Sequence, residues 1–160
     1  MLKLTKKADY GLIALKHLAV AGAQRSASAK EIAERYRIPL PLLSKILQKL
    51  AKQGFLQSEH GTNGGYRLAR DARSVTTLEV IRAIDGPIIL TACFTEHGEE
   101  CDQSAHCSVR EPLRKVHEGI LRLLGSISIA DLAQDEMADV AVEQFVHPPR
   151  KLVDLVPTLS

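Results

Sequence analysis

Cys93, Cys101 and Cys107 are the residues of this chain whose type and spacing best suit metal chemistry. Seven residues separate the first pair and five the second, unlike the short knuckles of structural zinc sites. An odd number of clustered cysteines is also unlike a disulfide framework. Thiolates are soft ligands that suit iron–sulfur clusters or zinc, and His97, His106 or a residue elsewhere would supply a fourth ligand. The spacing favours a cluster over zinc, and zinc over free thiols.

The charges of the chain are divided unevenly. Residues 1–70 contain 13 Lys and Arg against four Asp and Glu, whereas residues 71–160 contain eight against 15. The net charge of +2 therefore hides local balances of +9 and −7. A basic half attracts a polyanion, and an acidic half does not compete for it. This asymmetry is compatible with nucleic-acid binding by the first half and equally with a solvated basic surface, so other signals must decide.

Helix signals in the basic half predict a helix-turn-helix. Thr5 is placed to cap a helix ending near Ala23, and a capping box from Ser28 to Glu31 begins a short helix over 28–36. A turn then leads into a helix over 39–53, with prolines in its permissive first turn and glycine after its end. Its apolar residues recur at the spacing of a buried helical stripe: Leu43, Ile46, Leu47 and Leu50.

A hairpin is predicted directly after this third helix. Strands over 55–60 and 66–69 flank the glycine-rich turn from Gly61 to Gly65. The order helix, helix, helix, hairpin is that of a winged helix-turn-helix, in which the second helix of the pair enters the major groove of DNA. The predicted fold class is mainly α with a small β-hairpin wing.

The predicted DNA contacts fall into two groups. Ser44, Lys45 and Gln48 lie on the exposed N-terminal face of the recognition helix and are predicted to reach base edges. Phosphate contacts, which position the protein without reading sequence, are predicted for basic residues of the same half: Lys3, Lys6, Lys7, Lys30, Lys49, Lys52 and Arg67.

The acidic half predicts two further helices around the cysteines. A capping box from Thr76 to Glu79 begins a short helix that ends at Asp85, and a box from Ser108 to Glu111 opens a longer one closed by Gly125. The longer helix carries an apolar stripe: Leu113, Val116, Ile120, Leu123 and Leu124. We expect this stripe to pack against the same helix of a second subunit, with packing on its own winged domain as the alternative. A short helix is expected after Ser128.

These signals divide the chain into four parts. We predict a winged helix-turn-helix DNA-binding domain at 1–85, a cysteine-containing cofactor loop at 86–108 and a dimerisation helix region at 109–135. The tail at 136–160 contains three prolines between Pro148 and Pro157, and we expect it to be partly disordered.

Several function classes are disfavoured. No apolar run reaches the ~18–20 residues of a membrane span, and the N-terminus lacks the pattern of a signal peptide, so we expect a cytoplasmic protein without a membrane partner. The chain has no G-x-S-x-G, P-loop or H-E-x-x-H motif, and its six histidines form no catalytic grouping, so we do not expect an enzyme.

Several of these features together resemble one family, the IscR/NsrR/RirA-type winged-helix regulators of bacteria. The resemblance covers residues 1 to about 135 and rests on Leu4-Thr5-Lys6 with Tyr10, the wing from Gly61 to Leu68, the run from Leu78 to Ile81, and the three cysteines. The sequence from Gly86 to Cys93 looks most like the subgroup that controls the SUF cluster-assembly system. Membership implies a homodimeric repressor or dual regulator, binding a pseudo-palindromic site in double-stranded DNA, whose affinity depends on an iron–sulfur cluster.

The resemblance also bears on individual residues. The remaining predicted DNA contacts lie in the segments that carry the resemblance or directly before them: Thr5, His60, Thr62, Asn63 and Tyr66. His60 aligns with the family's DNA-contacting arginine of the wing, and Ser44 aligns with an acidic specificity residue, so the operator is expected to differ from that of the best-known members.

The fourth cluster ligand is the main departure from the family pattern. Members with a 2Fe–2S cluster have a histidine three residues after the last cysteine, where this chain has Arg110. In nitric-oxide-sensing relatives an aspartate of the first helix completes a 4Fe–4S cluster, and Asp9 aligns with it. The resemblance therefore favours a 4Fe–4S cluster held by the three cysteines and by Asp9 of the second subunit; a first-turn carboxylate that merely stabilises its helix is the alternative.

We expect oxidation, nitric oxide or removal of iron to damage the cluster. This damage would change the arrangement of the two DNA-binding domains of the dimer, and with it the affinity for DNA. Two other functions remain open at this point. The cysteines could form a thiol redox switch or a zinc site in a DNA-binding regulator, or the winged helix could be a protein-interaction module.

Overall fold

The first three helices form the expected helix-turn-helix domain. The computed structural model describes residues 3–62, 64–94, 103 and 106–134. Helix α1 spans Lys6–Ala21, α2 spans Ala29–Tyr36 and α3 spans Leu40–Lys52. Thr5 caps α1 by accepting a hydrogen bond from the Ala8 N–H, and Ser28 caps α2 by accepting one from the Glu31 N–H. These short polar side chains satisfy backbone donors that the first helical turn leaves unpaired.

The wing is a two-stranded antiparallel sheet of β1 (Leu56–Glu59) and β2 (Gly65–Leu68). Leu56 pairs with Leu68 and Glu59 with Gly65. The inner end of the hairpin is fixed to the loop between α1 and α2, because Ala27 and Tyr66 exchange backbone hydrogen bonds of 3.0 and 2.9 Å. A Cβ atom on Gly65 would lie 2.5 Å from the Ala27 carbonyl oxygen, so this position requires glycine.

One hydrophobic core joins all these elements. The predicted α3 stripe, Leu43, Ile46, Leu47 and Leu50, is buried as expected. It packs with the inward face of α1, including Leu15 and Leu18, and with Val80, Ile81 and Ile84 of helix α4 (Thr77–Asp85). α1 and α4 approach so closely that a Cβ on Gly11 would lie 2.2 Å from the Ile84 side chain.

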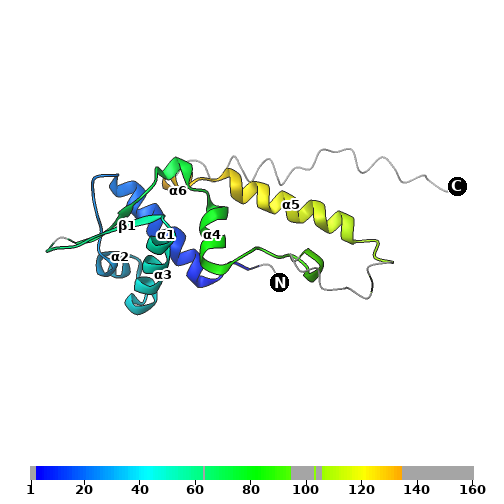
Figure 1. Cartoon of the computed structure of the whole chain (residues 1–160), viewed down its shortest axis with the longest axis horizontal. Coiled ribbons are helices and arrows are strands. Elements are labelled where there is room, and N and C mark those ends of the chain that lie inside the picture. The colour runs from blue at the N-terminus through cyan, green and yellow to red at the C-terminus, as the bar shows by residue number, and fades with distance from the viewer. Residues whose placement is uncertain (1–2, 63, 95–102, 104–105, 135–160) are drawn as a thin grey trace.

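Helix α5 (Arg110–Ser126) extends away from the winged domain, and the chain then returns to it through α6 (Ile129–Ala133) (Figure 1). The return is fixed by backbone bonds from the Ile129 N–H to the Val75 carbonyl and from the Thr77 N–H to the Ile127 carbonyl, at 2.8 and 2.9 Å. Ile129 is fully buried in the core. The helix expected after Ser128 is therefore confirmed, and it packs on α1 of the winged domain.

Two predicted helix ends in this half are wrong. Ser108 does not cap α5, because the helix begins at Arg110 with Val109 at its cap position, and the Glu111 carboxylate bonds Arg114 instead. Gly125 does not end the helix, which continues to Ser126. By contrast, the predicted capping box between Thr76 and Glu79 is complete, with both reciprocal bonds present.

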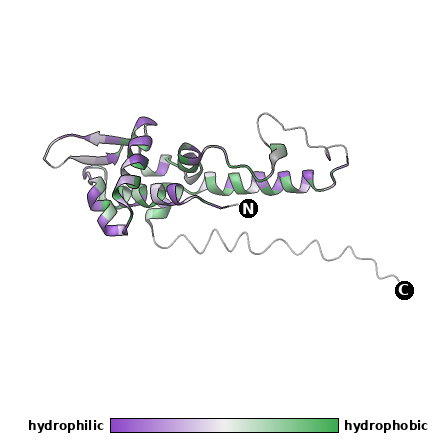
Figure 2. Cartoon of the chain, turned by 90° about the horizontal axis from the view of Figure 1, so that it is seen from below, coloured by the Kyte–Doolittle hydropathy of each residue, from purple (hydrophilic) through white to green (hydrophobic). Residues whose placement is uncertain are grey.

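The apolar stripe of α5 remains partly uncovered. Polar and apolar residues alternate along this helix, as Figure 2 shows. No residue of α5 is buried, and Val116 is 51% exposed. Within the described part of the chain, Leu124 near the base of the helix packs against the core. The predicted tail over 136–160 lies outside the described residues.

Candidate nucleic-acid interface and cysteine segment

Helix α3 presents the expected exposed face opposite its buried stripe. The side chains of Lys45 and Gln48 are exposed, and Ser44 is half-buried. Two prolines precede and enter the helix, so the first turn loses no intrahelical bond that it would otherwise make. The face is thus free of the core and able to enter a groove, and a lysine and a glutamine on it can hydrogen-bond base edges.

Lys49, from the same helix, is held differently from the other predicted phosphate contacts. Its ammonium group donates a 2.8 Å hydrogen bond to the backbone carbonyl of Ile84, in the last turn of α4. A cation beside the last carbonyls of a helix is favoured by the helix dipole as well as by the hydrogen bond. Lys49 therefore joins the recognition helix to the end of α4, a link that the sequence pattern did not indicate.

Thr5 also connects two elements. Besides capping α1, its hydroxyl donates to the carboxylate of Asp85, with oxygen–oxygen distances of 2.7 and 2.8 Å. Asp85 is the last residue of α4, so the start of α1 and the end of α4 are joined at the point where the chain leaves for the cysteines. The other predicted contacts near the N-terminus, Lys3, Lys6 and Lys7, are exposed.

The predicted wing contacts lie around the hairpin. His60 and Thr62 are exposed, Tyr66 is half-buried, and Asn63 lies outside the described residues. The Arg67 guanidinium forms an ion pair of 2.9 Å with Glu59 and donates to the Gln57 side chain at 3.1 Å. Its charge is thereby partly balanced on the surface of the wing. Elsewhere, Lys30 is exposed and lies 3.9 Å from Glu34, and Lys52 is exposed at the end of α3.

The cysteine segment connects α4 to α5. Cys93 lies in a short 3₁₀ turn (Ala92–Phe94), and Cys107 lies just before α5; both are free thiols and half-buried. Cys101 is outside the described residues, and among those that are described no three His, Cys, Asp or Glu side chains form a metal-binding group. The predicted partner ligand Asp9 is exposed in the first turn of α1.

One residue near the cysteines was missed by the sequence reasoning. The ring of His117, on α5, stacks on Phe94 with ring centroids 5.2 Å apart. Its Nδ1 atom is buried and has no hydrogen-bond partner among the residues that the structure describes. Its position four residues after Leu113 in the apolar stripe was the available signal. A buried, unpaired imidazole nitrogen beside a cysteine turn is a candidate ligand atom.

Comparison with known proteins gives consistent results. The family model described as Rrf2, iron-dependent transcriptional regulator, matches residues 4–135. The HTH-type transcriptional regulator NsrR of Geobacillus kaustophilus is 33% identical over 134 residues, covering 84% of this chain and 91% of the relative. The HTH-type transcriptional regulator IscR of Xenorhabdus nematophila is 33% identical over 144 residues, covering 89% and 87%. All of these relatives are transcriptional regulators and none is an enzyme.

Two solved structures are similar over most of the chain. CymR (YrzC), the global cysteine regulator of B. subtilis, has a TM-score of 0.69 at 27% identity and covers 83% of this chain and 97% of its own. IscR of T. potens has a TM-score of 0.65 at 31% identity, covering 82% and 85%. The mainly helical fold with a β-hairpin wing is thus confirmed. No helix among the described residues is long and apolar enough to cross a membrane.

The bond from Lys49 to the Ile84 carbonyl predicts a difference between two neighbouring lysines. Lys49→Met keeps the apolar stem and removes the donor, so the free energy of unfolding should fall by about 1–2 kcal/mol. Lys45→Met, on the exposed face, should change it by less than about 0.5 kcal/mol. Urea unfolding of the two variants would measure both values, and equal stability would show that the Lys49 bond contributes nothing.

Proposed function

Since this chain belongs to the Rrf2 family of iron-dependent transcriptional regulators, we propose that it is a homodimeric repressor whose operator affinity is set by an iron–sulfur cluster. The observation that carries the proposal is the link from α3 to the end of α4, from which the chain leads directly into the cysteine segment. Lys49 of α3 bonds Ile84, Asp85 follows it, and the chain then runs through Cys93 to a ring stack on α5. A change at the cysteines would thus reach the helix that reads DNA.

In the proposed complex, α3 enters the major groove, where Ser44, Lys45 and Gln48 contact base edges. The wing contacts the backbone or the adjacent minor groove through His60, Thr62, Asn63, Tyr66 and Arg67. Thr5, Lys6, Lys30 and Lys49 lie toward the phosphates, with Thr5 and Lys49 also serving the internal contacts described above. Two reading heads in a dimer imply a pseudo-palindromic site.

The exposed lysine of α3 gives a direct test of DNA binding. Lys45→Gln should weaken binding to duplex DNA and reduce the slope of log affinity against log salt by up to about one, because one fewer cation faces the DNA. Fluorescence anisotropy over a salt series would measure this. Arg82→Gln, which removes an exposed arginine on α4, serves as the control. An identical slope and affinity for Lys45→Gln would remove α3 from the DNA interface.

The residues near α5 are chemically suited to hold the proposed cluster. Cys93 and Cys107 supply soft thiol donors at the two ends of one short segment, and Cys101 lies between them in sequence. Among the described residues, the buried Nδ1 atom of His117 beside the Cys93 turn has no hydrogen-bond partner, so His117 is the alternative fourth ligand. When bound, the cluster would supply redox-sensitive ligand bonds that hold the segment in one arrangement. Its proposed type is 4Fe–4S, with Asp9 of the partner subunit as fourth ligand.

The second subunit is proposed from the uncovered stripe of α5. Leu113, Val116 and Ile120 lie on a helix of which no residue is buried, and Val116 is 51% exposed. An apolar face of this length is normally covered. Packing of α5 against its copy would cover it and bring two winged domains together at a fixed separation. We further propose that this dimer acts in the cytoplasm and controls genes for cluster assembly or for the response to iron stress.

The cluster hypothesis predicts the behaviour of Cys93→Ala. Anaerobically reconstituted wild-type protein should absorb broadly in the visible region and contain about four irons per subunit. Cys93→Ala should lose most of the iron and the absorbance, and its DNA affinity should no longer respond to iron. Ser108→Ala, which changes an exposed residue next to Cys107, is the control. Wild-type protein without iron, or Cys93→Ala protein with unchanged iron and unchanged response, would contradict the hypothesis.

The identity of the fourth ligand gives a separate prediction. Asp9→Asn should alter the visible absorption and the reduction potential of the reconstituted protein, whereas His117→Asn should leave both unchanged. The reverse result would assign the ligand to His117, whose buried Nδ1 has no hydrogen-bond partner in the described structure. Unchanged spectra and potentials for both variants would show that neither residue binds the cluster.

A thiol redox switch is the second candidate, and one contact favours it. The hydroxyl of Thr91 lies 3.0 Å from the Cys93 sulfur, where it could donate to a thiolate. The iron content of the reconstituted protein separates the two functions, since a thiol switch would contain none.

A further inference from the structure

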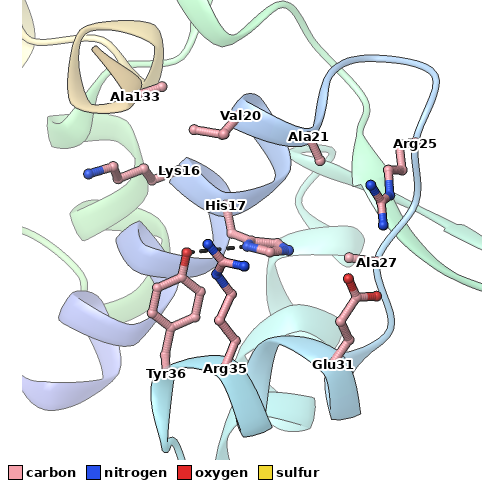
Figure 3. A pocket seen from close by; sticks show the side chains of 10 residues that line it. All are labelled: Lys16, His17, Val20, Ala21, Arg25, Ala27, Glu31, Arg35, Tyr36 and Ala133. Carbon is pink, nitrogen blue, oxygen red and sulfur yellow. Dashed lines mark hydrogen bonds between the residues drawn. The ribbon is translucent and has the colours of Figure 1, made fainter. Parts of the chain in front are cut away.

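The winged domain contains a cavity whose lining includes no residue of the cysteine segment. It has a volume of about 510 Å³, within the range of small-molecule sites. Its lining comes from α1, the loop after it, α2 and Ala133 of α6 (Figure 3). The recognition helix and the hairpin contribute nothing to this lining, so the cavity is separate from the proposed DNA contacts.

The polar groups of the cavity are mostly cationic. Arg25 extends from the loop and Arg35 from α2, and both point toward the same space as His17 (Figure 3). Glu31 is the carboxylate among the lining residues. The Arg35 guanidinium lies 5.8 Å from the centre of the Tyr36 ring, and the Tyr36 hydroxyl lies 3.2 Å from His17 Nδ1.

The pKa of His17 is lowered by burial first and by this positive charge second. Burial lowers the pKa of His17 first, Arg35 lowers it further, Glu31 opposes the shift, and Arg25 adds to it. Lys16 of α1 also lines the cavity. Burial and the nearby guanidinium groups therefore disfavour the protonated form of the imidazole, and an anion bound beside it would oppose this lowering of its pKa.

We propose that this cavity binds a small organic anion carrying a carboxylate or a phosphate group. The guanidinium groups of Arg25 and Arg35 bind its oxygens, because planar guanidinium donors match the geometry of both anions. The Tyr36 hydroxyl and His17 supply further hydrogen bonds. The apolar side chains of Val20 and Ala133 leave room for a short aliphatic body.

The position of the cavity gives such a ligand access to the DNA-reading elements. Ala27 lines the cavity and exchanges two backbone hydrogen bonds with Tyr66 of the wing. Arg35 and Glu31 lie on α2, which packs against α3. A ligand bridging Arg25 and Arg35 would hold the loop against α2 and thereby fix the inner end of the wing. This effect on DNA rests on the proposed function, whereas binding of the anion does not.

Binding can be measured without DNA or iron. Inorganic phosphate and succinate would each be titrated into the protein at constant ionic strength. Nuclear magnetic resonance would follow the imidazole signal of His17, which is assigned by its disappearance in the His17→Asn variant. We expect saturable binding that raises the pKa of His17 and therefore strengthens as the pH falls through the titration of this group. Arg35→Gln should weaken binding about tenfold or more, the cost of one charge-assisted contact. Arg82→Gln, on α4 outside the cavity, should leave it unchanged.

Two results would overturn the proposal. The first is that neither anion binds saturably, or that Arg82→Gln weakens anion binding as much as Arg35→Gln does. The second is an Arg35→Gln protein with unchanged anion binding but a smaller salt dependence for duplex DNA, which would make the cavity a phosphate contact of the DNA.

Discussion

The hydrogen bond between the Lys49 ammonium and the Ile84 carbonyl joins α3, the proposed recognition helix, to the end of α4. Lys49 belongs to α3, and Ile84 lies in the last turn of α4, just before the chain continues toward the cysteines. The side chain of Ile84 also fills the space that Gly11 leaves open on α1. One residue of α4 thus contacts both helices, so α4 cannot shift its end without disturbing α1 and α3 together.

The features predictable from sequence were those with local causes. Thr5, Ser28 and Thr76 cap helices because a short polar side chain beside free backbone N–H groups is favoured in almost any context. The buried stripe of α3 followed from its periodicity. The Ser108 prediction was wrong for a local reason too, since Glu111 pairs with Arg114 and is not available to complete a capping box.

The features that sequence could not predict depend on contacts between distant segments. The bond from Lys49 to Ile84 joins residues 35 positions apart, and that from Thr5 to Asp85 joins residues 80 apart. The return of α6 to the core is fixed by backbone bonds, which carry no side-chain signal. Among the candidate ligands, the type and spacing of the cysteines indicated their chemistry, whereas the buried nitrogen of His117 became visible only through its stacking on Phe94.

The return of the chain after α5 also has a mechanical consequence. α5 is 17 residues long, about 25 Å, and its C-terminal end is fastened to the winged domain through Thr77, which donates to the Leu124 carbonyl, and through Ile129. Cys107 lies just before the N-terminal end of α5, and the Phe94 ring stacks on His117 near the middle of the helix. The helix is therefore a lever anchored in the winged domain, with the Cys93 turn against its middle and Cys107 before its far end. Small displacements near the thiols would reach the winged domain as a rotation.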